Sequence, residues 1–81
     1  MTNDTLTTEE QIIYDKLDFF FNNKINVHIV LKRSNNKGEN VWLNGLLVEK
    51  NSNRLWLLDE RILGKVRVSI SEIKFVEEER R

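Results

Sequence analysis

The sequence contains no cysteine and only one histidine. A disulfide is therefore excluded, and no group of residues has the spacing of a metal-ligand set, so two usual supports of small folds are missing. With 81 residues the chain has room for one domain and a small core. Self-association is the remaining common way to stabilise such a core, and we expect it here. We expect no cofactor.

Long apolar runs are also missing. The longest, such as residues 29–31, fall far short of the length that spans a membrane. The first residues do not form the basic region followed by an apolar one that a secretion signal has. These absences, together with the lack of cysteine, predict a cytoplasmic protein that binds no membrane.

Charge of one sign does not dominate, because 13 basic residues balance 13 acidic ones. The balance gives no indication of a strongly basic nucleic-acid binder. Locally the charge is uneven: residues 1–20 carry five acids against one lysine, whereas residues 21–38 carry four bases and no acid. We therefore expect an acidic cap and a basic stripe formed by Lys24, Lys32, Arg33 and Lys37.

One helix is predicted near the start of the chain. Thr7 and Glu10 have the spacing of a capping box, in which each side chain accepts from the backbone N–H of the other residue. Apolar residues then recur at helical spacing until two asparagines, so the helix is expected over residues 8–22. Residues 1–7 are expected to be disordered. Of the three phenylalanines at 19–21, two should cover the sheet, and the third either joins the core or is exposed.

Alternation of apolar and polar residues predicts five strands after the helix. Gly45 lies inside the second strand and indicates a sharp bend or a close backbone approach. The third strand is apolar in both alternating sets, so we expect it to be covered on both sides. The strands are expected at residues 25–32, 41–48, 54–59, 66–71 and 73–76, with a loop at 33–40, a turn at 51–53 and a charged tail at 77–81.

The predicted fold class is mainly β: an N-terminal helix followed by a bent five-stranded antiparallel sheet, of the SH3-like small-barrel kind, in one domain over residues 8–76. Such a sheet either closes into a barrel or leaves edge strands whose backbone N–H and C=O groups must be covered. Pairing of edges between subunits would cover them.

Two short segments carry a resemblance to a known family. Val-Trp-Leu-Asn-Gly at residues 41–45 is similar to a hydrophobic-x-Leu-Gln-Gly strand, and Ser-Ile-Ser-Glu-Ile at residues 69–73 is similar to an Ala-Ile-Ser-Thr-Ile strand. The two reference motifs, with the same spacing between them, are those of the Sm-like (LSm) superfamily, and the chain most resembles its bacterial branch, the RNA chaperone Hfq. The resemblance covers residues 14–76, with 33–40 as an insertion. It implies a homo-oligomeric ring, with six subunits as the first expectation, that binds single-stranded RNA as a post-transcriptional regulator or RNA chaperone.

The resemblance also implies where RNA would bind. In the family's uridine pocket a stacking aromatic aligns with Asn53, and a Tyr-Lys-His segment aligns with residues 66–68, where Arg67 keeps the basic position. The family's adenine-stacking tyrosine aligns with Val30. Since stacking on an aromatic contributes about 1–3 kcal/mol per base, the lost aromatics argue against uridine-tract binding in the family's usual mode. The candidate RNA-binding residues are Lys24, Val30, Lys32, Arg33, Trp42, Asn44, Asn51, Ser52, Asn53 and Arg67.

Several side chains have a plain structural alternative. Trp42 is either a stacking platform or a packed residue, whereas Trp56, between leucines, is expected in the core or a subunit interface. Arg67 either contacts RNA or is a solvated strand residue or one partner of an ion pair between subunits. The basic stripe either follows phosphates or only solubilises the chain. His28 is the only histidine and lies in the outward set of its strand with no pattern of Cys, His or carboxylate residues nearby, so we expect neither metal binding nor base catalysis. No nucleophile accompanies the acidic pairs, and we expect no enzyme activity.

Three hypotheses follow from these residues. The first is an RNA-binding Sm-like ring. The second is an Sm-like ring or small barrel that has lost uridine-tract RNA binding and recognises a protein partner, which the missing aromatics and the zero net charge favour. The third is a monomeric SH3-like barrel.

Overall fold

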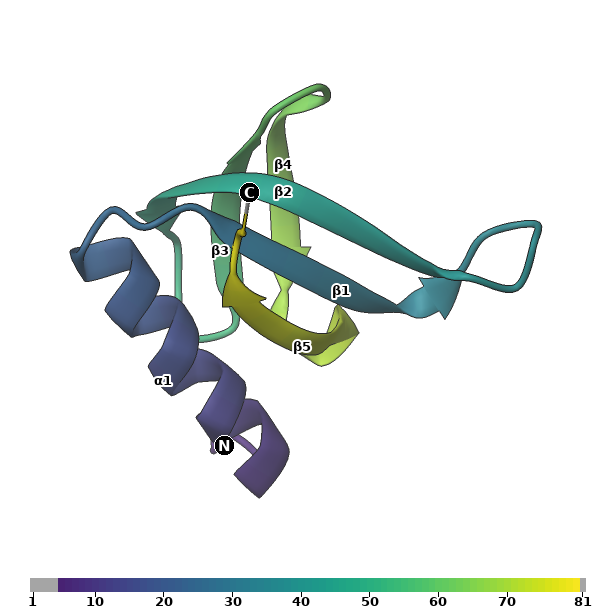
Figure 1. Ribbon diagram of the computed structural model, residues 1–81. Coiled ribbons are helices and arrows are strands. Elements are labelled where there is room, and N and C mark those ends of the chain that lie inside the picture. The colour runs from purple at the N-terminus through teal and green to yellow at the C-terminus, as the bar shows by residue number, and fades with distance from the viewer. Residues whose placement is uncertain (1–4, 81) are drawn as a thin grey trace.

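The computed structural model describes residues 5–80 and shows one helix followed by five antiparallel strands (Figure 1). The helix, α1, runs over Thr8–Asn22. The predicted capping box holds its start: the Thr7 hydroxyl accepts from the Glu10 N–H at 3.1 Å, and the Glu10 carboxylate accepts from the Thr7 N–H at 3.0 Å. The disorder predicted for residues 1–7 falls partly on residues 1–4, which lie outside the described residues. The Thr5 carbonyl accepts a hydrogen bond from Arg54.

All five strands belong to one sheet. They are arranged in the order β4-β3-β2-β1-β5, and each neighbouring pair is antiparallel. The mainly β fold class is therefore confirmed. In Figure 1 the β1–β2 hairpin projects beyond the rest of the sheet, and α1 lies to one side of it. The strands are β1 (Val27–Ser34), β2 (Asn40–Lys50), β3 (Leu55–Glu60), β4 (Gly64–Ser69) and β5 (Ile73–Glu78).

The last two strands differ in their bounds from the prediction. β4 ends at Ser69, because a short 3-10 helix, η1 (Ile70–Glu72), carries the chain from β4 to β5. The Glu72 carboxylate accepts from the Ser69 N–H at 3.3 Å and so holds this turn. β5 continues into the predicted charged tail, where Glu77 is the backbone partner of His28 on β1. Alternation alone does not separate a strand from such a turn.

The core lies between the concave side of the sheet and α1. Leu17 of the helix is fully buried, and so is Trp56 of β3, which meets the rings of Tyr14 and Phe21 edge-on at centroid distances of 5.8 and 5.7 Å. Phe20 and Phe21 pack against the core, whereas Phe19 is 57% exposed. The predictions for Trp56 and for two of the three phenylalanines are confirmed.

The third strand is covered on one side only. Trp56 and Leu58 face the core and are fully buried, but Leu55 and Leu57 face away from it and remain half-buried. The expectation that β3 is covered on both sides is therefore wrong for the single chain. Both alternating sets are apolar, but α1 and the curved sheet enclose only the Trp56 side.

Gly45 marks the predicted close approach between strands. It is paired with Glu60 of β3, and a Cβ atom added at this glycine would lie 2.9 Å from the Asp59 carbonyl carbon and closer still to its oxygen. Because the obstacle is backbone, no side-chain rotation can make room. Only glycine fits here.

We expect Gly45→Ala to lower the free energy of unfolding by about 3 kcal/mol, because the added methyl group must displace backbone. Gly38→Ala is the matched control. Gly38 has φ +80° and nothing within 4 Å of the added Cβ, so only the left-handed conformation opposes alanine, at a cost of about 1 kcal/mol. Urea unfolding of both variants measures the difference, and equal losses would contradict the close approach.

Candidate nucleic-acid interface

The side of β5, β1 and β2 that faces away from the core is called here the outer face. Along its middle, Phe75 and Trp42 flank Val30, which is the backbone partner of both. Trp42 is 56% exposed and Phe75 41% exposed, whereas Val30 is nearly covered because a large ring lies on each side of it. This aromatic row presents two ring surfaces to solvent on three neighbouring strands.

A polar row lies beside the aromatic row. It consists of Glu77, His28 and Asn44, which are cross-strand neighbours on β5, β1 and β2. His28 Nδ1 lies 2.5 Å from the Asn44 carboxamide oxygen, and the His28 ring centroid lies 5.6 Å from that of Trp42. The two rows are therefore joined through His28, which lies on the outer face as its position in the alternating pattern predicts.

Basic side chains gather at the other end of the outer face, toward the β1–β2 hairpin. Lys32 and Arg33 are exposed near the end of β1, and Lys74 of β5 donates to the Asn40 side chain at 3.3 Å. Exposed Lys37 lies in the hairpin loop. The ion pairs of the described chain involve other cations, namely Lys50 with Asp18, Arg54 with Glu10 and Arg61 with Glu79.

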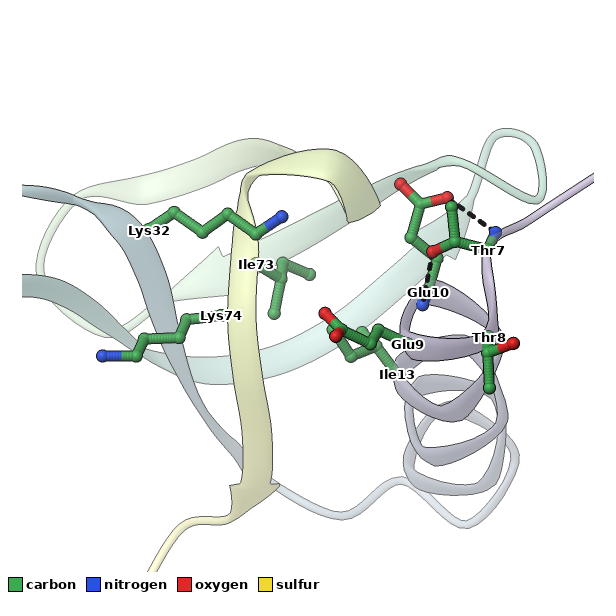
Figure 2. Close-up of a pocket in the computed structure, with 8 residues that line it drawn as sticks. All are labelled: Thr7, Thr8, Glu9, Glu10, Ile13, Lys32, Ile73 and Lys74. Carbon is green, nitrogen blue, oxygen red and sulfur yellow. Dashed lines mark hydrogen bonds between the residues drawn. The ribbon is translucent and has the colours of Figure 1, made fainter.

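Figure 2 shows the groove between this basic end and the start of α1. It has a volume of about 490 Å³ and takes Lys32 and Lys74 from the strands and Glu9 and Glu10 from the helix. The Thr7 backbone N–H chiefly lowers the pKa of Glu10, and the charges of Arg54 and Lys32 add to the effect. The groove therefore contains charges of both signs. Its basic side chains come from the strands, and its acidic side chains come from the helix.

Lys24 lies apart from the outer face, directly after α1. The Ile25 N–H donates to the Phe20 carbonyl at 3.0 Å and the Lys24 N–H to the Phe21 carbonyl at 3.3 Å. This is a Schellman motif, in which the residue at the place of Lys24 takes a left-handed conformation and is usually glycine. Lys24 has φ 55°. A lysine at this position places one cation at the negative end of the helix dipole.

The remaining candidates lie on other parts of the sheet. Asn51 and Ser52 are exposed in the β2–β3 turn, where Asn51 donates to Glu49 at 2.6 Å and the Ser52 hydroxyl accepts from the Arg54 N–H. Asn53 is half-buried in the same turn. Arg67 is exposed on β4 opposite Leu57. Of the ten candidates, the structure brings Val30, Trp42 and Asn44 together on one face, with Lys32 and Arg33 at the basic end of its strands.

Glu60 shapes the neighbouring β3–β4 turn. Its buried carboxylate accepts from the backbone N–H groups of Leu63 at 2.8 Å, Ile62 at 2.7 Å and Asn44 at 3.4 Å. These bonds, first of all that of Leu63, lower the pKa of the Glu60 carboxyl. The turn leaves Ile62 88% and Leu63 68% exposed, two apolar side chains at the tip of a fixed hairpin.

Sequence reasoning gave no binding role to three residues of this interface: His28, Phe75 and Glu77. Their proximity depends on the pairing of β1 with β5, whose residues are far apart in the chain. The alternating pattern places His28 in the outward set of its strand, but it groups Phe75 with Ile73 and leaves Glu77 in the charged tail. Ile73 is buried and Phe75 is exposed, because the register between β1 and β5 shifts between these two residues. The pattern does not tell which strands are neighbours.

We expect Lys24→Gly to raise the free energy of unfolding by about 0.5–1 kcal/mol, because glycine adopts the left-handed conformation without strain. Lys24→Ala is the control, since it removes the same charge and keeps the strain. Thermal unfolding of both variants is the measurement. Alanine and glycine variants of equal stability would contradict the strained position.

We expect Glu60→Gln to lower the free energy of unfolding at pH 7, because a neutral amide accepts more weakly from the turn N–H groups. The folded pKa of Glu60 lies below the ordinary value of 4.5. Its stabilisation is therefore complete above that value and is lost as the pH falls through the folded pKa. Urea unfolding between pH 7 and pH 3 should show the two proteins converging toward acid, and a constant gap would contradict the role of the carboxylate.

Two absences apply to residues 5–80. No helix in that range is long and apolar enough to cross a membrane, and no group of three or more histidine, cysteine or acidic side chains is placed to hold a metal ion. A helix followed by five antiparallel strands in this order is compatible with the Sm-like topology. Comparisons with protein-family models, curated proteins and solved structures found no significant match to this chain.

Proposed function

We propose that this protein is an Sm-like RNA-binding protein that assembles as a homo-oligomeric ring and binds single-stranded RNA on the outer face. The observation that carries the proposal is the aromatic row. Trp42 and Phe75 are exposed on β2 and β5, the two strands that flank β1. Bases of single-stranded RNA stack on such rings whatever their sequence. RNA pairing or turnover after transcription is the process in which such a ring would act.

The charge of the outer face supports the proposal. Lys32, Arg33 and Lys74 lie toward the hairpin end of the outer face, and none of them is in an ion pair within residues 5–80. Lys32 and Lys74 also line the groove that contains Glu9 and Glu10, whereas Arg33 does not. Lysines and arginines that neutralise phosphates release bound counterions, and the affinity then falls steeply with salt. Aromatic surface and positive charge together are what a single strand requires.

The two edges of the sheet support a ring. β4 and β5 end the strand order, and each offers one row of backbone N–H and C=O groups that has no strand partner among residues 5–80. Pairing β4 of one subunit with β5 of the next would cover both edges, and repetition of one such contact closes a ring when the rotation permits. Six subunits is the number that the family resemblance implies.

The alternative is a ring or small barrel that recognises a protein. The exposed tip formed by Ile62 and Leu63 favours it, because two apolar side chains on a fixed turn suit a partner pocket better than a phosphate backbone. The balanced net charge of the chain agrees with this alternative. The two functions predict different effects of charge reversal.

The test is binding of fluorescently labelled oligo-A, oligo-U and mixed-sequence RNA at several salt concentrations, with the mass in solution measured by light scattering. We expect saturable binding that weakens with salt, and about a tenfold loss of affinity in Trp42→Ala, as the removal of one stacking platform predicts. The double variant Lys32→Glu with Arg33→Glu should bind all the RNAs weakly.

A matched control separates local from overall charge. The double variant Lys65→Glu with Arg67→Glu makes the same change in net charge at two exposed residues of β4, which is not part of the outer face. It should lose much less affinity. Absence of saturable binding to every RNA would refute the RNA proposal, and equal losses in both double variants would refute its assignment to this face.

A further inference from the structure

The outer face changes in character along its strands. Outward residues of one strand are about 6.6 Å apart, so His28 and Val30 place the polar row directly beside the aromatic row on β1. The basic end begins in the irregular part of β1 between Val30 and Ser34. The polar end contains carboxylates and the opposite end contains amines. A ligand with a negatively charged part, a flat ring and a polar edge would have one preferred direction on this face.

A hollow of about 330 Å³ lies at the polar end. It is lined by the whole polar row and by the last residues of the described chain, namely Glu78, Glu79 and Arg80. The His28 ring, which lines this hollow, lies next to the Trp42 ring, and the two ring centroids are 5.6 Å apart. The charge of Glu79 is balanced by Arg61 at 2.8 Å. A base stacked on Trp42 would therefore direct its edge toward the hollow.

The hydrogen-bonding groups of the hollow are defined by the contact between His28 and Asn44. The Asn44 oxygen accepts from His28 Nδ1, so the Asn44 amide nitrogen keeps its N–H donors for a ligand. In the tautomer with the proton on Nδ1, the other ring nitrogen of His28 is an acceptor. Glu77 is exposed and, within residues 5–80, has neither an ion pair nor a side-chain hydrogen bond. The row thus offers more acceptors than donors.

Among the bases, guanine has the matching edge. Its N1–H and N2–H₂ groups are adjacent donors that one carboxylate can accept together, and its O6 accepts from an amide N–H. Adenine instead places the N1 lone pair next to its single amino group, where it would oppose a carboxylate oxygen. Uracil has only one N–H. The order of groups from Glu77 to Asn44 therefore favours guanine over the other bases.

We infer that the hollow formed by Glu77, His28 and Asn44 is a guanine-recognition site for single-stranded RNA, with Trp42 as its stacking platform. Glu77 accepts from N1–H and N2–H₂, and Asn44 donates to O6. The inference rests on the proposed RNA function and specifies which base this face prefers. The carboxylates repel phosphates from the hollow, so the backbone of the RNA passes on the side of Lys32 and Lys74.

The experiment compares labelled 12-nucleotide RNAs of cytidine and uridine that carry isolated guanosines, inosines or adenosines at the same three positions. Isolated guanosines prevent four-stranded structures. We expect the guanosine RNA to bind about tenfold more tightly than the adenosine RNA, the discrimination of one bidentate contact. Inosine keeps N1–H and O6 but lacks the N2 amino group, so its RNA should bind with intermediate affinity.

Glu77→Gln tests the assignment to the hollow. It should abolish most of the preference for guanosine while binding of the adenosine RNA stays equal or improves, because one negative charge is removed. Glu49→Gln is the control, since it removes the same charge from an exposed β2 residue that does not line the hollow. This control should keep the full preference.

Each outcome decides between the proposals. Equal affinity of the unaltered protein for guanosine and adenosine RNA would overturn the guanine site and leave RNA binding standing. A preference for guanosine that persists in Glu77→Gln would overturn the placement of the site. Absence of binding to all three RNAs would overturn the RNA function and the guanine site together.

Discussion

The backbone contact between β2 and β3 at Gly45 is the constraint on which the rest of the sheet depends. With no side chain at Gly45, the Asp59 carbonyl can lie directly against it, and the register of the two strands follows. That register places Glu60 where its carboxylate accepts from the Asn44 N–H and from the following turn. Asn44 in turn is presented on the outer face beside His28.

The two sides of the sheet differ in their interactions. The helix is held mainly by buried apolar contacts, with Leu17 and Trp56 fully covered, and Lys50 bridges Tyr14 and Asp18 at the margin. Half-exposed ion pairs of this kind contribute little, so burial dominates the stability of this side. On the outer face the rings and most of the cations remain in solvent. Stability and the proposed binding are thus carried by opposite sides of the same sheet.

The local signals of the chain predicted much of this fold. The capping box at Thr7 and Glu10, the strand alternation and the close approach at Gly45 all involve residues near one another in sequence, and the structure confirms them. The end of β4 and the extension of β5 were not predicted. Alternating apolar residues continue through residues 70–73, and only hydrogen bonding to β1 determines where the last strand begins and ends.

On the regular parts of β1 and β2 the sequence by itself determined which residues face outward, because that depends only on the two-residue period of a strand. Trp42, Asn44 and His28 belong to outward sets for this reason, and the family resemblance had already assigned the first two to RNA. Tertiary structure alone decided that Glu77 and Phe75 join them, since the first strand and the last strand of the chain are neighbours in the sheet. It also decided the covering of Val30, which is apolar and outward but lies between two larger rings.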